Sequence, residues 1–284
     1  MKPSSRFQTS AAPSRALFNP SYLPMPLLLL FLFLFLPPQL LPAQPKSELA
    51  PPPPLSPAEG EREARKLLDN LLAQKPDQNG TNTGTLKIRD VERHERAVPV
   101  RFEVVLDSGR WLNTYQALPG DGTAGQLLSI THRDGTPNEY LLTSTGGTNG
   151  AADASRKLAG NELMVPFAGS DFWAVDLGLE FLYWPQQRVL KKQMRKNLFC
   201  DVLQSTNPSP APGAYSRVLS WIAVNRPEEI IVVHAEAYDL QGKLLKEFDP
   251  KKVQKINGVW QLEEMEIRNR QTGSRTRIEF NLDQ

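Results

Sequence analysis

The stretch Ser274–Leu282, SRTRIEFNL, decides the fold class of this chain because its side chains alternate in polarity. There are four largely apolar positions, which are Thr276, Ile278, Phe280 and Leu282. They alternate with four charged or polar positions, which are Arg275, Arg277, Glu279 and Asn281. Successive side chains of a β-strand point to opposite faces, so the stretch predicts a strand with one apolar and one charged face. Strands of this kind form antiparallel sheets that bury a single side.

Short segments of the same character fill most of the chain on the N-terminal side of this strand. Turn sequences rich in Gly, Asn and Asp separate them, and such short connections predict antiparallel neighbours. The expected strands cover residues 99–106, 111–115, 126–130, 139–142, 187–195, 198–205, 215–223, 229–239, 243–248, 258–268 and 274–282. Residues 144–160, rich in Gly, Ala, Ser and Thr, are expected to form a mobile loop, with a short helix over 151–158 as an option.

Two helices are expected beside this sheet. The first covers about 58–74, where Ser56 and Pro57 are typical of a helix start and apolar residues follow at helical spacing. The second is expected between Ser170 and Pro185. Its aromatic and aliphatic residues fall at i, i+4, i+8 and i+11, which predicts a single apolar stripe: Trp173, Leu177, Phe181 and Trp184.

A sheet with one apolar face and few helices must cover that face with its own helices. We therefore expect a mainly β (α+β) fold, in which a strongly curved antiparallel sheet folds around its helices. The expected domain covers residues 58–284.

The first 57 residues have a different composition from this domain. Residues 1–43 combine three basic residues, the apolar run Leu27–Leu36 and a small residue at Ala43, which is the layout of a cleavable secretory signal peptide. An uncleaved anchor and a translation start at Met25 are the alternatives. Residues 44–57 are expected to form a proline-rich linker. These features predict an exported, soluble protein.

The charge balance argues against nucleic-acid binding. The 284 residues hold 33 Lys and Arg against 31 Asp and Glu, and the first 43 residues contribute three of the bases and none of the acids. The remainder carries 30 bases (33 − 3) against 31 acids, which leaves no basic footprint for neutralising phosphates.

Catalytic and metal-binding patterns are absent from the sequence. His94, His132 and His234 are too scattered for metal-ligand spacing. Cys200 is the single cysteine, so it has no disulfide partner in the chain, and we expect it to be buried and inert. We expect a monomer that is not an enzyme and needs no cofactor.

Five segments of the second half carry a family resemblance: Ser170–Pro185, Tyr215–Ile222, Glu236–Asp239, Trp260–Met265 and Thr272–Arg277. In combination they resemble the outer-membrane lipoprotein-sorting protein family (LolA-like), well over 170–284 and in outline over 58–160. The resemblance implies that the sheet forms an incomplete, half-closed β-barrel closed by helices, and that its hollow carries lipoprotein acyl chains through the periplasm of a Gram-negative-type envelope. It also implies a membrane-bound donor or acceptor protein as a possible partner. The carrier's lid arginine matches no residue of this longer branch.

On this basis we expect an apolar hollow that binds acyl chains of lipids or lipoproteins and helps to sort them to the outer membrane. The residues expected to line it are Trp173, Leu177, Phe181, Trp184, Met194, Trp221 and Met265. Ordinary core packing is the alternative for these side chains. A lipid sensor without transfer activity and a structural protein whose own helices fill the hollow are the rival functions.

One basic cluster, Lys191-Lys192 with Arg195-Lys196, is expected near a hairpin tip. It is interpreted either as a solvated turn or as a docking surface for anionic headgroups or an acidic partner.

Overall fold

The computed structural model describes residues 53–120, 124–145, 154–226, 229–256 and 259–281. All of them belong to one compact unit, Leu49–Gln284. The predicted signal peptide, residues 1–43, and residues 44–52 of the predicted linker lie outside the described residues. Within the described ranges, no helix combines the length and the apolar composition that crossing a membrane requires.

Thirteen strands form a single sheet in this part of the chain, and every neighbouring pair is antiparallel. They are β1 (Gly80–Arg89), β2 (Glu95–Asp107), β3 (Arg110–Ala117), β4 (Gly125–Arg133), β5 (Glu139–Thr145), β6 (Ala154–Leu158), β7 (Gln186–Arg195), β8 (Leu198–Thr206), β9 (Arg217–Arg226), β10 (Glu229–Tyr238), β11 (Leu244–Ile256), β12 (Val259–Asn269) and β13 (Arg275–Asn281). The order across the sheet is β6-β5-β4-β3-β2-β1-β13-β12-β11-β10-β9-β8-β7. The pairing of β1 with β13 therefore joins two meanders, and the predicted open antiparallel fold is confirmed.

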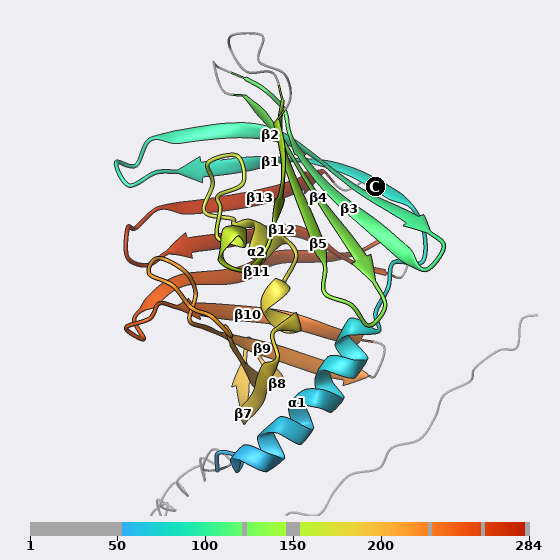
Figure 1. Ribbon diagram of the computed structural model, residues 1–284, viewed down its shortest axis with the longest axis vertical. Coiled ribbons are helices and arrows are strands. Elements are labelled where there is room, and N and C mark those ends of the chain that lie inside the picture. The colour runs from blue at the N-terminus through green and yellow to red at the C-terminus, as the bar shows by residue number, and fades with distance from the viewer. Residues whose placement is uncertain (1–52, 121–123, 146–153, 227–228, 257–258, 282–284) are drawn as a thin grey trace, which may run out of the picture. The chain divides into compact units, whose positions relative to one another are not determined.

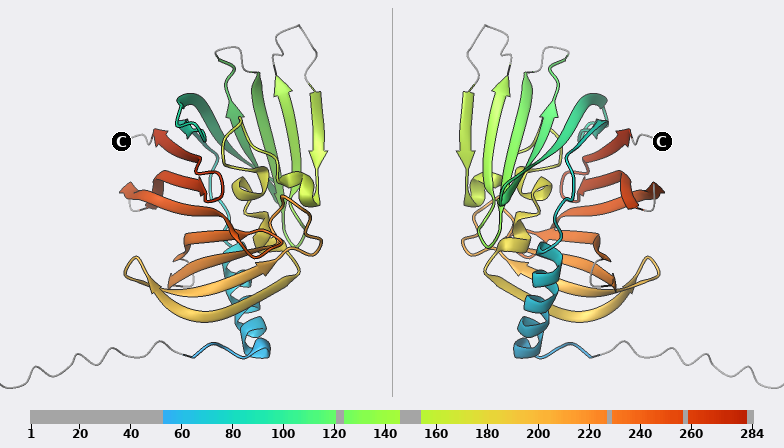
Figure 2. Two further views of the ribbon diagram at one scale, coloured as in Figure 1. Left: turned by 90° about the vertical axis from the view of Figure 1, so that its left-hand side faces the viewer. Right: turned by 90° about the vertical axis from the view of Figure 1, so that its right-hand side faces the viewer.

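The sheet is strongly curved, so that β2–β6 and β7–β13 form two wings that face each other (Figure 1; Figure 2). The chain between β6 and β7, yellow in Figure 2, lies between the wings on the concave side. Helix α1 (Pro57–Leu72) confirms the first predicted helix and begins at a capping box formed by Ser56 and Glu59. Its buried side chains join the core on the concave face.

The main core lies on the concave face because the strands present most of their buried apolar residues to that side. In β13, Thr276 and Ile278 are buried, and the alternating Arg275 and Arg277 are partly exposed, as the sequence pattern predicts. The largest fully buried aliphatic side chains of the concave face come from both wings: Leu86, Leu128, Ile130, Leu203, Ile222, Ile267 and Ile278. A smaller cluster on the convex face includes Cys200 and Trp221.

The prediction of one helix over 170–185 is wrong. The structure has a four-residue helix α2 (Ala174–Leu177) and a separate 3₁₀ turn η2 (Glu180–Tyr183). Between them Leu179 adopts a left-handed backbone, φ 48°, which a continuing right-handed helix cannot contain. The four predicted stripe residues therefore do not lie along one helix.

Two strands were missed at the sequence level. Ala154–Leu158 forms the edge strand β6, so the short helix expected over 151–158 is wrong for its described residues, and 146–153 lie outside the described residues. β1 was missed because Gly80 and Gly84 were interpreted as the end of the helical pattern. Gly84 instead lies in the centre of the sheet, where a Cβ would overlap the carbonyl oxygen of Glu279.

We predict that Gly84→Ala destabilises the fold by about 1–3 kcal/mol, because the added methyl must displace backbone of β13 at the junction of the two meanders. Gly80→Ala is the matched control in the same strand, since nothing lies within 4 Å of the added carbon. Its free energy of unfolding should change by less than about 0.5 kcal/mol. Urea unfolding of both variants measures the difference, and equal stabilities would contradict the close approach of β1 and β13.

Candidate functional site

The concave face is covered by the segment of residues 159–185, which we call the insert. It contains η1 (Gly160–Leu163), α2 and η2, and an isolated bridge joins its residues Pro166 and Trp173. Its large buried apolar side chains pack against both wings of the sheet: Phe167, Phe172, Val175, Leu177, Phe181 and Leu182. The insert therefore supplies the apolar layer that the open sheet lacks.

A cavity of about 20 Å³ remains between the insert and the sheet, with Asp176, Phe181, Tyr215 and Lys246 in its wall. One water needs about 10–15 Å³ by this measure, and an apolar cavity of about 150 Å³ admits benzene. In this conformation the space is large enough for one water and much too small for an acyl chain. Binding of an acyl chain on this face requires the insert to move.

Asp171 attaches the insert to β13. Its carboxylate accepts hydrogen bonds from the hydroxyls of Ser274 and Thr276, the latter over 2.9 Å between Oγ1 and Oδ2. The backbone N–H of Asp171 donates in turn to Thr276 Oγ1 at 2.9 Å. The bonds with Thr276 are almost wholly removed from solvent and the bond with Ser274 is partly buried, so together they fix the position of this part of the insert.

Lys246 of β11 lies beneath the insert with only 2% of its surface exposed. Its Nζ donates to the backbone oxygen of Asp171 at 2.6 Å, lies 3.2 Å from the centre of the Trp173 ring, and is 3.8 Å from Asp176 Oδ2. Burial disfavours the charged form and lowers the pKa of Lys246 to about 7, although Asp176 acts against this shift.

Asp176 is the buried acidic partner in this cluster. It accepts a hydrogen bond from the Tyr215 hydroxyl at 2.9 Å and one from the backbone N–H of Trp173 at 2.8 Å. Burial raises the pKa of Asp176, and Lys246 partly offsets the effect. The Trp173 and Tyr215 rings stack with their centres 5.0 Å apart, which closes the cluster against the core.

The other wing also holds the insert by polar contacts. The Tyr115 hydroxyl donates to the backbone oxygen of Leu177 at 3.0 Å, and the Tyr140 hydroxyl donates to Glu180 Oε2 at 3.0 Å. Arg96 of β2 donates to the backbone oxygen of Ala168 at 2.7 Å. The insert is therefore held by β2, β3 and β5 on one side and by β11, β13 and Tyr215, which precedes β9, on the other.

Five of the predicted site residues lie in or against the concave core. Four are on the insert and one is on β12: Trp173, Leu177, Phe181, Trp184 and Met265. All five contact other apolar side chains of the core, as the core-packing alternative expects. Their contact with a ligand stays a prediction.

Met194 and Trp221 do not join this group. Trp221 is buried in the convex cluster beside Cys200, and its ring N–H donates to Gln193 at 3.3 Å. Met194 lies at the end of β7, paired with Phe199 of β8, and is 51% exposed. The structure thus places both residues outside the core beneath the insert.

Sequence reasoning missed the polar residues that hold the insert: Asp171, Asp176, Tyr215 and Lys246. A signal was present, because three acids lie in the otherwise apolar run over 171–182 and Lys246 follows Leu244 and Leu245 in a strand. An ionisable residue within an apolar strand indicates a buried partner. The sequence alone does not say which acid that partner is.

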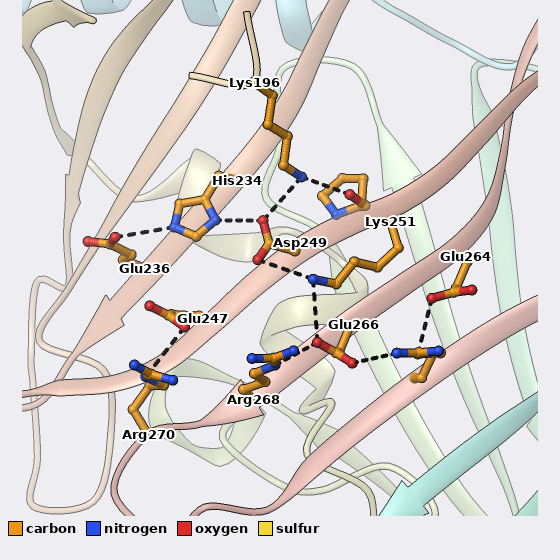
Figure 3. Close-up of polar contacts among 12 residues, drawn as sticks. Lys196, His234, Glu236, Glu247, Asp249, Lys251, Glu264, Glu266, Arg268 and Arg270 are labelled. Atoms are coloured by element: carbon orange, nitrogen blue, oxygen red, sulfur yellow. Dashed lines mark hydrogen bonds and ion pairs between the residues drawn. The ribbon is translucent and has the colours of Figure 1, made fainter. Parts of the chain in front are cut away.

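The convex face carries a network of ion pairs (Figure 3). His234 is buried between Asp249 and Glu236, 2.9 Å and 3.2 Å from their carboxylate oxygens, and this accounts for its place in an apolar strand. Lys196 lies at the β7–β8 turn, as predicted, and pairs with Asp249 at 3.2 Å. Lys192 pairs with Asp201 at 2.9 Å, so two residues of the predicted basic cluster have acidic partners.

Comparisons with known proteins place this geometry in a fold group. A family model described only as an uncharacterised protein matches residues 149–282. No curated protein matches the sequence. A solved structure of a DUF1329 family protein from Desulfovibrio piger is similar with a TM-score of 0.61 and 15% identity, over 78% of this chain and 90% of that protein.

A domain from Vibrio parahaemolyticus assigned to outer membrane lipoprotein sorting is similar with a TM-score of 0.53 and 18% identity, over 79% of this chain and 91% of that domain. A LolA superfamily protein from Nitrosomonas europaea is similar with a TM-score of 0.49 and 13% identity, over 77% of this chain and 91% of that protein. The chain therefore has the fold of the lipoprotein-sorting domain, and the fold expected from the resemblance is confirmed.

We predict that the free energy of unfolding rises by about 2 kcal/mol between pH 7.5 and pH 9.5 through Lys246. The unfolded chain keeps this proton up to its ordinary pKa of 10.5, and the folded chain releases it above about pH 7. Between pH 7 and pH 10.5 the unfolded state binds more protons than the folded state, so the free energy of unfolding increases with pH. This gain disappears as the pH falls toward 7.

Lys246→Met should remove this rise, whereas Lys87→Met, at a lysine whose side chain is 57% exposed, should retain it. Urea unfolding at four pH values measures the slopes. Parallel slopes for wild type and Lys246→Met would contradict a neutral lysine beneath the insert.

Proposed function

We propose that this protein is an exported, non-enzymatic carrier that binds acyl chains of lipids or lipoproteins on the concave face and helps to sort them to the outer membrane. The observation that carries the proposal is that this apolar face is covered by a segment with little regular secondary structure, and not by a second sheet. An acyl chain takes the place of the apolar side chains of the insert. The signal-like residues 1–43 support a periplasmic location.

The energetics of acyl chains explain why such a carrier is needed. Each buried methylene contributes about 0.8 kcal/mol, so a chain of about 14 methylenes is held in a membrane by about 11 kcal/mol. Transfer through water requires a surface that is similarly dry. The concave face offers this surface, because its buried aliphatic side chains come from strands of both wings.

The way in which the insert is held makes its displacement feasible. Several of its contacts with the sheet are hydrogen bonds, such as those of Asp171 with Ser274 and Thr276. Water can replace hydrogen bonds of this kind when the insert moves away, so each contributes only about 1–3 kcal/mol net. An incoming acyl chain restores the apolar burial that the insert gives up.

The similarity to the Vibrio domain supports the proposal, since that domain is named for outer membrane lipoprotein sorting. Lipid or lipoprotein acyl chains are the proposed ligand, with a membrane-bound donor or acceptor as the partner. The side chains proposed to meet the ligand are those of the concave core: Trp173, Leu177, Phe181, Trp184 and Met265.

A second candidate is a structural protein whose concave face is permanently filled by its own insert. The cavity of about 20 Å³ favours it, because the insert leaves no room for a ligand in this conformation. A lipid sensor that binds without transferring is a third. The three functions differ in uptake and in release.

We predict that the protein takes up a fluorescent fatty acid and delivers it to vesicles. The double variant Ser274→Ala/Thr276→Val should take it up several-fold faster, because it removes the hydroxyls that hold Asp171. Thr131→Val is the matched control, because Thr131 lies on the face of β4 opposite to the buried Ile130, away from the concave core. Stopped-flow fluorescence measures uptake, and native mass spectrometry of protein purified from its own periplasm reports a bound lipid.

The outcomes separate the three candidates. If neither the wild type nor the variants take up the fatty acid and no lipid is bound, the protein is a structural protein. A tightly held stoichiometric lipid that is not delivered to vesicles would indicate the sensor. Hydrolysis of a lipid ester that one point substitution abolishes would overturn the non-enzymatic assignment.

A further inference from the structure

A cleft of about 180 Å³ lies where β1, β12 and β13 meet the turn between the last two strands. Its wall is rich in arginine and contains no acid: Arg89, Arg268, Asn269, Arg270, Gly273, Ser274 and Arg275. The volume is roughly tenfold more than the ~10–15 Å³ that one water requires by the same measure. It is separate from the concave cavity and from every residue proposed to meet an acyl chain.

Three of these arginines form a row across three neighbouring strands. Arg275 of β13 is directly opposite Arg89 of β1 on one side and Arg268 of β12 on the other. Side chains that are directly opposite in an antiparallel pair share one face and approach closely, and like charges there destabilise the sheet. The row is on the convex face, because the adjacent Ile88, Thr276 and Ile267 are buried on the concave side.

The carboxylates of this region neutralise only part of the positive charge. Arg268 pairs with Glu266 at 2.6 Å and Arg270 with Glu247 at 3.4 Å (Figure 3). Among the described residues, no carboxylate oxygen lies within 4.0 Å of the side-chain nitrogens of Arg89 or Arg275. Two guanidinium groups at this cleft are therefore without an acidic partner in the described chain.

Arg89 also carries a buried hydrogen-bond donor. Its Nε is buried and has no acceptor among the described residues. A buried guanidinium nitrogen without an acceptor is unfavourable, because a charged donor has been removed from solvent. An anion bound in the cleft would accept a hydrogen bond from this donor and offset the repulsion between the arginines of the row.

We propose that the cleft binds a phosphoryl group, either as free phosphate or as the phosphate of a lipid headgroup. Arginine is the residue best suited to this anion, because its planar fork donates two parallel hydrogen bonds to adjacent phosphate oxygens. Arg89 and Arg275 supply the two forks that lack a carboxylate, and Arg268 and Arg270 add positive charge at the rim. The bound anion offsets the repulsion along the row.

The test measures binding of inorganic phosphate by calorimetry and thermal unfolding at constant ionic strength, with chloride as the balancing anion. Arg275→Gln should weaken phosphate binding about tenfold or more, because it removes the central fork of the row. Arg101→Gln is the matched control, since Arg101 is an exposed arginine of β2 whose Nη2 is 3.7 Å from Glu103. It should bind phosphate as the wild type does.

A second readout separates binding from a structural role. Without phosphate, Arg275→Gln should melt at or above the wild-type temperature, because one of three opposed charges is gone. Phosphate should then raise the melting temperature of wild type and Arg101→Gln and leave that of Arg275→Gln nearly unchanged. An Arg275→Gln protein that is less stable without phosphate and equally stabilised by it would overturn the proposal.

Vesicles distinguish the two sources of the phosphoryl group. Phosphatidic acid vesicles are compared with phosphatidylcholine vesicles in a sedimentation assay. Arg275-dependent binding to phosphatidic acid vesicles, but not to phosphatidylcholine vesicles, assigns the site to a headgroup. Arg275-dependent binding of inorganic phosphate without binding to either kind of vesicle assigns it to free phosphate. Absence of Arg275-dependent binding to both probes would overturn the site. Uptake of the fluorescent fatty acid is scored separately, so the site and the carrier function can fail independently.

Discussion

An apolar concave face that no second sheet covers is the constraint on which the rest of this structure depends. Thirteen antiparallel strands in the described chain present their apolar side chains to one side, and water must be kept from that side. The chain solves this with α1 and the insert, residues 159–185. Because the insert is joined to both wings by hydrogen bonds as well as by apolar contacts, the cover is distinct from the sheet that it protects.

The two faces of the sheet carry different chemistry, and both follow from the alternation of side chains along each strand. The concave face buries aliphatic residues and one lysine, Lys246, whose charge is disfavoured by burial. The convex face carries ion pairs and the arginine row of Arg89, Arg275 and Arg268. An acyl chain on one face and a phosphoryl group on the other would therefore be bound by independent sets of residues.

Most of the sheet could be predicted from the sequence because a strand with one buried face has apolar residues at every second position. The segment 274–282 shows this directly, and its buried Thr276 and Ile278 alternate with partly exposed arginines. The insert could not be predicted in the same way. Its apolar residues have helical spacing, but the left-handed backbone at Leu179 depends on packing between the two wings. Of the predicted lining residues, Trp221 lies in the convex cluster, and Met194 is exposed at the end of β7, away from the insert.

By itself the sequence determined eleven of the thirteen described strands, the polarity of their faces and the first helix, since these depend on residues close together in the chain. Only the tertiary structure decided which residues meet across strands. Asp171 reaches Thr276, 105 residues away, and Arg89 lies beside Arg275 because of the register between β1 and β13. Register is a property of paired strands, so no single segment contains it, and both the cover of the concave face and the arginine cleft arise at that level.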